Sequence, residues 1–88
     1  MSAEQIARLF IIRITSGPHA GRYVGGSFGG GLVTNPEVQN NPPVNVPGSK
    51  YGLWAQKATA TRFIEAAVHD AAAALTALGY EVEMIQVQ

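Results

Sequence analysis

The chain has 88 residues, 47% of them hydrophobic and 14% charged, and six basic residues balance six acidic ones, which fits one domain over residues 1–88. The charged fraction is well below the ~25% of an average protein, which excludes a polar disordered chain, and the zero net charge gives no overall field to attract nucleic acid or an anionic membrane. The absence of cysteine excludes disulfides, zinc–thiolate sites and cysteine nucleophiles, and it suits the reducing cytoplasm where we expect the protein.

Residues 7–24 are predicted to form a β-hairpin. Two sets of side chains alternate with the period of two that is typical of a strand, Phe10, Ile12 and Ile14 against Ile11, Arg13 and Thr15. Pro18 between Gly17 and Gly21 predicts the turn, since proline fixes φ and glycine leaves it free. The longest apolar run, residues 9–12, is far shorter than the ~20 residues of a membrane span, so we expect no membrane attachment.

Residues 25–50 are predicted to be a long loop, because they hold six of the ten glycines, four of the five prolines and all four asparagines. This loop is expected either to cover part of a sheet or to contact a partner. Residues 51–54 are predicted to be a short third strand.

Residues 59–78 are predicted to form an alanine-rich helix that begins at Thr59 or Thr61 as N-cap. Its apolar residues follow one another in steps of three and four: Phe63, Ile64, Ala67, Val68, Ala71, Ala74, Leu75 and Leu78. Gly79 predicts a Schellman ending, with Leu75 and Tyr80 in contact. Residues 80–87 are predicted to be a C-terminal strand, in which residues 80–84 alternate.

Together these elements predict an α+β fold, a small and mostly antiparallel sheet covered on one face by one helix. The other face carries four apolar residues of the first and last strands: Leu9, Ile11, Ile85 and Val87. We expect the loop or a second subunit to cover them. Ile85 and Val87 also lie out of phase with the preceding alternation, which indicates either a bulge or cover on both faces.

We expect no enzyme activity, cofactor or metal site, because the residues for such chemistry lack the required context. The glycine-rich loop contains neither GxGxxG nor the Gly-Lys-Ser/Thr of a phosphate-binding loop. Ser16, His19 and Asp70 are the residue types of a hydrolase triad, but no nucleophile-elbow sequence surrounds Ser16. Glu65 and His69 lie four residues apart on the predicted helix, and without a third metal ligand we expect a solvated ion pair.

Nucleic-acid binding is not expected either. Arg8, Arg13 and Arg22 gather in the hairpin, but Arg13 is expected to face Glu81 and Glu83 of the last strand. A stacking platform for bases interleaves aromatic with basic residues, and outside the predicted helix only Tyr23, next to Arg22, fits that pattern.

Protein binding is the remaining class, since tyrosine and tryptophan are enriched at interface hot spots. Four aromatic residues in glycine- or proline-bearing surroundings are the candidate partner-binding residues: Tyr23, Phe28, Tyr51 and Trp54. The alternative for Trp54 is a core role, in which it anchors the loop onto the helix.

Several short sequences occur together in an order seen in a known group of proteins. They are residues 10–18, residues 20–23, Trp54, residues 60–63, Ala66, Ala67, Leu75 and residues 79–83. In these segments the chain resembles small accessory proteins encoded by tailed phages and prophages, with residues 25–50 as an insertion. The resemblance implies no catalytic residue, and some phage proteins of this size and plan inhibit host defence systems, anti-CRISPR proteins among them.

We therefore expect a non-enzymatic interaction protein of phage type that acts in the host cytoplasm and binds a host protein, such as a CRISPR or other defence component. The alternatives are an oligomeric binder of a small ligand or nucleotide that uses the glycine-rich loop, and a structural phage protein. A homodimer is left open.

Overall fold

The structure is a computed structural model that describes residues 8–27 and 36–88. In this part of the chain the elements are β1 (Leu9–Ile14), β2 (Tyr23–Gly26), α1 (Pro36–Asn40), β3 (Val44–Asn45), β4 (Tyr51–Trp54), the 3₁₀ helix η1 (Lys57–Thr59), β5 (Phe63–Ile64), α2 (Glu65–Ala77) and β6 (Val82–Gln86). The strands form one antiparallel sheet of six, accompanied by one main helix. The expected α+β class is thereby confirmed.

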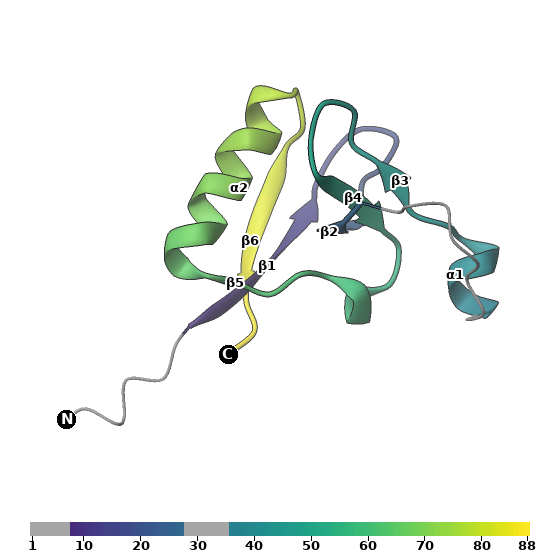
Figure 1. The fold of residues 1–88 in the computed structure, drawn as a ribbon, viewed down its shortest axis with the longest axis horizontal. Coiled ribbons are helices and arrows are strands. Elements are labelled where there is room, and N and C mark those ends of the chain that lie inside the picture. The colour runs from purple at the N-terminus through teal and green to yellow at the C-terminus, as the bar shows by residue number, and fades with distance from the viewer. Residues whose placement is uncertain (1–7, 28–35) are drawn as a thin grey trace.

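The first strand, β1, is the centre of the sheet (Figure 1). One edge of β1 pairs with β6 over five residues. The other edge is shared, because β5 pairs with Leu9 and Phe10 whereas β2 pairs at Arg13. Beyond β2 the order continues through β4 to β3. Since β2 leaves β1 after Tyr23 and β5 takes its place, the sheet divides at this point, and the pocket described below lies there.

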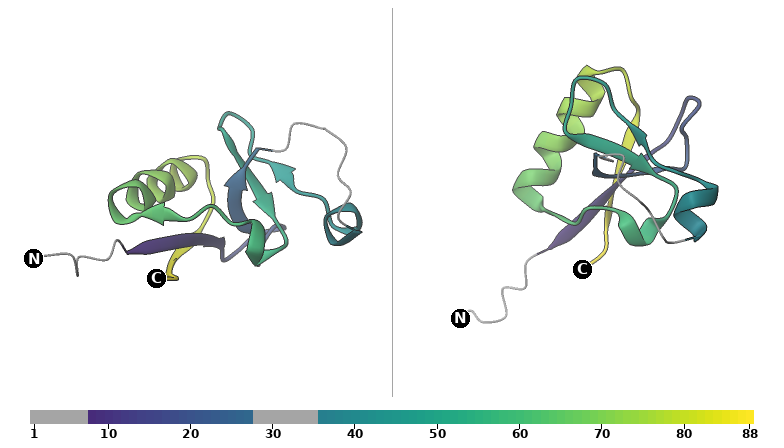
Figure 2. Two further views of the ribbon diagram at one scale, coloured as in Figure 1. Left: turned by 60° about the horizontal axis from the view of Figure 1, so that its bottom comes forward. Right: turned by 45° about the vertical axis from the view of Figure 1, so that its right-hand side comes forward.

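The core lies between α2 and the sheet, where α2 packs against β1, β5 and β6 (Figure 2). Its fully buried residues come from both halves of the fold: Ile12, Ile14, Val24, Val46, Leu53, Val68, Ala71 and Leu75. The alternation of β1 explains the choice of Ile12 and Ile14, which lie on the α2 face, whereas Arg13 lies on the opposite face.

The beginning of the helix differs from the expectation. Neither Thr59 nor Thr61 caps α2, which begins at Glu65 after Ile64 as N-cap. The Thr59 hydroxyl instead donates to the Gln56 carbonyl oxygen within the 3₁₀ turn. Phe63 pairs with Phe10 of β1, so the two residues before the helix are held in extended form by a strand pairing that local sequence does not reveal.

The buried face of α2 is also rotated from the expected one. Val68, Ala71 and Leu75 are buried against the sheet, whereas Ala74 and Leu78 are exposed. The apolar stripe of this sequence is wider than the surface that the sheet covers, so one side of it is left open.

The end of the helix confirms the expected Schellman motif. Gly79 has a φ of 97°. The N–H of Tyr80 donates to the Leu75 carbonyl oxygen at 3.1 Å, and the N–H of Gly79 donates to the Thr76 carbonyl oxygen at 3.0 Å. These two bonds satisfy carbonyl groups that the helix leaves without partners, and they turn the chain back toward β6.

The last strand, β6, keeps one register along β1, from Phe10 opposite Gln86 to Ile14 opposite Val82. No bulge interrupts this ladder, so Ile85 lies opposite Ile11 on the face away from α2. Of the apolar residues on that face, Ile11 is only 2% exposed, while Leu9, Ile85 and Val87 are half-buried.

The expected loop of residues 25–50 contains short elements in its described part. It includes the end of β2, the helix α1 and the strand β3, and its Val46 belongs to the main core. The guanidinium of Arg22 connects this segment to β4. It donates to the carbonyl oxygens of Pro42 and Leu53, both at 3.1 Å, and to Asn41 Oδ1 at 2.6 Å.

Candidate binding pocket

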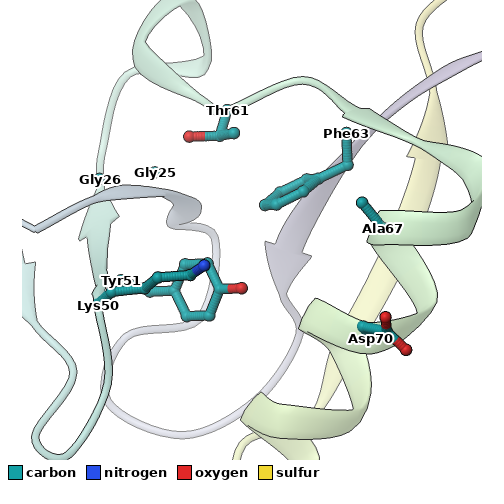
Figure 3. Close-up of a pocket in the computed structure, with 8 residues that line it drawn as sticks. All are labelled: Gly25, Gly26, Lys50, Tyr51, Thr61, Phe63, Ala67 and Asp70. Atoms are coloured by element: carbon teal, nitrogen blue, oxygen red, sulfur yellow. The ribbon is translucent and has the colours of Figure 1, made fainter.

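A pocket of about 490 Å³ lies where β2 and β4 diverge from β5 and α2 (Figure 3). The described residues that line it are Gly25, Gly26, Lys50, Tyr51, Thr61, Phe63, Ala67 and Asp70. One wall therefore comes from the β2–β4 pair and the other from β5 and the first turns of α2.

The two glycines of β2 make the wall on their side thin. A Cβ on Gly26 would have no heavy atom within 4 Å, so this position opens into free space. A Cβ on Gly25 would instead stand 2.8 Å from Trp54 Cδ1 and 2.9 Å from the Thr59 carbonyl oxygen. Gly25 is thus required for close packing on the outer side of the sheet, whereas Gly26 leaves the pocket open.

Two aromatic rings form the apolar part of the lining. The rings of Tyr51 and Phe63 meet edge to face, with centroids 6.3 Å apart and an interplanar angle of 65°. The ammonium group of Lys50 lies 5.8 Å from the centroid of the Tyr51 ring, within the range of a cation–π contact. The Lys50 charge is therefore directed toward the protein's own aromatic ring.

Asp70 brings a negative charge to the opposite wall. Its side chain is exposed and makes no hydrogen bond or ion pair with the rest of the described chain. The lining therefore carries one charge of each sign, the Lys50 ammonium beside Tyr51 and the Asp70 carboxylate on the opposite wall. A group bound in the pocket would meet two aromatic rings, the methyl group of Ala67, an ammonium group and a carboxylate.

The open side of the α2 stripe continues this wall. Residues three, four and seven positions apart in a helix lie on one side, which places Ala67, Asp70, Ala74 and Leu78 together. Ala74 is exposed, and Leu78, which directly follows the helix, is 45% exposed. We call these four residues the α2 flank. It extends the apolar lining of the pocket toward the C-terminal end of α2.

The four aromatic candidates from the sequence are not brought together. Tyr51 lines the pocket, whereas Tyr23 and Trp54 lie directly opposite one another in β2 and β4 on the other face of the sheet. The Trp54 indole N–H donates to the Gly26 carbonyl oxygen at 2.8 Å. Trp54 therefore packs against the strands beside it rather than against the helix, and Phe28 lies outside the described residues.

The charged residues singled out in the sequence have mostly structural roles. Arg13 Nη1 lies 2.8 Å from Glu83 Oε1, so the expected contact between Arg13 and Glu83 is formed. Arg22 is occupied by its three oxygen acceptors. Among the described residues no ion pair joins Glu65 to His69, so the expected contact between them is not formed.

Sequence reasoning did not identify Phe63, Ala67 and Asp70 as site residues. The sequence does contain one indication of the site: the apolar stripe of α2 is wider than the surface that one sheet can bury. Asp70 gave no signal of its own, since an isolated acidic residue on a helix is usually solvated.

Within residues 8–27 and 36–88 there is no group of three potential metal ligands. No helix in that part of the chain has the length and apolarity needed to cross a bilayer. Comparisons of the chain with protein-family models, with curated proteins and with solved structures find no match.

Proposed function

We propose that this protein is a binding module whose pocket and α2 flank together receive an apolar segment of a partner protein. The observation that carries the proposal is the continuity of the two surfaces. From Ala67 to Leu78 the flank runs for about 16 Å, at ~1.5 Å per helical residue. This length suits an extended or helical segment better than a single small molecule.

The side chains of the lining indicate which residues the partner segment would contain. An apolar or aromatic side chain would contact Tyr51 and Phe63, and a second apolar side chain would cover Leu78. Full burial of a leucine side chain contributes roughly 1.5–3 kcal/mol, so two such contacts supply a useful part of a protein–protein affinity. A basic residue of the segment would pair with Asp70.

The resemblance to phage accessory proteins supports a host defence protein, such as a CRISPR component, as the first class of partner to test. In this account the protein acts by occupying a surface of its partner and catalyses no reaction. The action takes place in the host cytoplasm.

A second candidate function is the binding of a small apolar ligand. The pocket volume favours it, since ligand sites commonly measure about 300–1,000 Å³. Gly25 and Gly26, which begin the glycine-rich segment, also form one of its walls. A ligand of this kind would fill the pocket and leave Leu78 uncovered.

A matched pair of variants at Gly26 tests the proposal. Gly26→Phe places a ring in the open space of the pocket, whereas Gly26→Ala adds one methyl group that meets nothing within 4 Å. In a pull-down from host lysate, we expect the wild-type and Gly26→Ala proteins to retain the same partner and Gly26→Phe to lose it. A thermal-shift screen of small molecules examines the second candidate, because a ligand that binds only the folded state raises the Tm.

A further inference from the structure

The outer hydrogen-bonding edge of the strand β6 is open as far as residues 8–27 and 36–88 are concerned. In the described part of the chain β6 pairs with β1 alone. The N–H of Thr15 donates to the Glu81 carbonyl oxygen, and the N–H of Val87 donates to the Leu9 carbonyl oxygen. In an antiparallel ladder the bonding residues alternate, so Glu83 and Ile85 also bond to β1. The N–H and C=O groups of three residues therefore point outward: Val82, Met84 and Gln86.

This edge has little of the protection that proteins give exposed strands, since the one charged residue of β6, Glu83, is paired with Arg13. Such edges are usually short, bulged, or marked by lysine or proline. The edge at the other end of the sheet follows this rule, since β3 has two residues and lies between Pro43 and Pro47. β6 has five residues in continuous register and contains no lysine or proline.

β6 also carries apolar residues on both of its faces. Met84 lies opposite Ile12, on the face that carries α2, and is 44% exposed. Ile85 lies on the other face and is half-buried. A strand that remains at the surface normally alternates apolar and polar residues, whereas a strand with apolar residues on both faces is typical of a sheet interior.

We propose that β6 pairs antiparallel with β6 of a second copy of this chain, around a twofold axis at Met84. In this register Met84 faces Met84 of the second copy, and Val82 faces Gln86, so all of the outward backbone groups of both strands find partners. Glu83 faces Ile85 of the second copy. Its charge is already paired with Arg13, so no two unpaired charges stand opposite one another.

Hydrogen exchange of the wild-type protein, followed by NMR from micromolar to millimolar concentration, tests this pairing directly. We expect the amides of Val82, Met84 and Gln86 to become protected as the concentration rises, in step with a doubling of the mass measured by light scattering. The amides of Glu83 and Ile85 should be protected throughout, because they bond to β1.

Two variants identify the surface. Met84→Pro removes an outward N–H and leaves the β1 ladder its donors, since proline is tolerated where the N–H faces solvent. We expect this variant to be monomeric. Ile64→Lys changes the exposed apolar residue of β5, on the face away from α2, and we expect it to dimerise like the wild-type protein.

The proposal is overturned by a wild-type protein that remains monomeric at millimolar concentration. It is also overturned by a dimer in which the three amides stay unprotected, or by a dimer that persists in Met84→Pro. A dimer lost in Ile64→Lys would place the contact on the sheet face instead. The exchange measurement on the wild-type protein decides the question if Met84→Pro does not fold.

Discussion

Trp54 occupies the space that a side chain on Gly25 would need. Its Cδ1 atom would stand 2.8 Å from a Cβ at that position, and the Thr59 carbonyl oxygen would stand 2.9 Å from it. The indole also donates to the neighbouring Gly26. Trp54 of β4 thus packs across β2 and fixes the outer side of the pocket wall.

Two alanine substitutions in β2 should therefore differ strongly in effect. We expect Gly25→Ala to lower the free energy of unfolding by about 1–3 kcal/mol, as overpacking does, because one of its close neighbours is backbone. Gly26→Ala should change it by less than about 0.5 kcal/mol, since its Cβ meets open space. Urea unfolding of both variants checks this, and equal stabilities would refute the packing described for Trp54.

A second matched pair examines the rotation of α2. Ala71 is buried against the sheet and Ala74 is exposed. We expect Ala71→Leu to cost on the order of 1–3 kcal/mol and Ala74→Leu to be within about 0.5 kcal/mol of the wild type. Thermal unfolding measures both. A large loss of stability in Ala74→Leu would mean that Ala74 faces the sheet, as the sequence predicts, and that α2 is not rotated.

Arg22 should be more important than other surface arginines. It bonds to oxygens of Asn41, Pro42 and Leu53, and its planar guanidinium suits this geometry better than an ammonium group does. We expect Arg22→Ala and Arg22→Lys both to destabilise the fold, by about 1–2 kcal/mol for the alanine variant, with faster amide exchange around β3. The control is Arg62→Ala, at an exposed position, and an Arg22→Lys protein as stable as the wild type would contradict this role.

Substitutions of Asp70 and of its neighbour His69 should differ in their effect on partner affinity. The sequence gives neither a functional role, but the structure places Asp70 in the pocket lining and His69 outside it. With the captured partner, we expect Asp70→Ala to weaken binding about fivefold, since an exposed ion pair contributes up to ~1 kcal/mol. His69→Ala should bind like the wild type. Calorimetry measures both, and a loss confined to His69→Ala would move the site to another side of α2.

Local sequence signals predicted much of the fold and little of the site. The Gly79 ending, the β1 alternation and the β4 strand each depend on residues close in sequence, and all three are found. The predicted start of the helix at Thr59 or Thr61 was wrong because Phe63 pairs with Phe10, more than fifty positions away in the chain. The pocket depends on where β2 leaves β1, which is a property of the topology, so only Tyr51 of the four aromatic candidates lies in it.

The central claim, that the pocket and the α2 flank form one protein-binding surface, is tested most directly by the affinity of the captured partner for two adjacent arginine variants. Ala74 lies on the flank, whereas Ala73 is an exposed helix position turned about 100° away from it. We expect Ala74→Arg to weaken the measured Kd at least tenfold and Ala73→Arg to leave it unchanged, with both proteins folded. Equal affinities for the two variants, or a loss at Ala73 alone, would contradict the account.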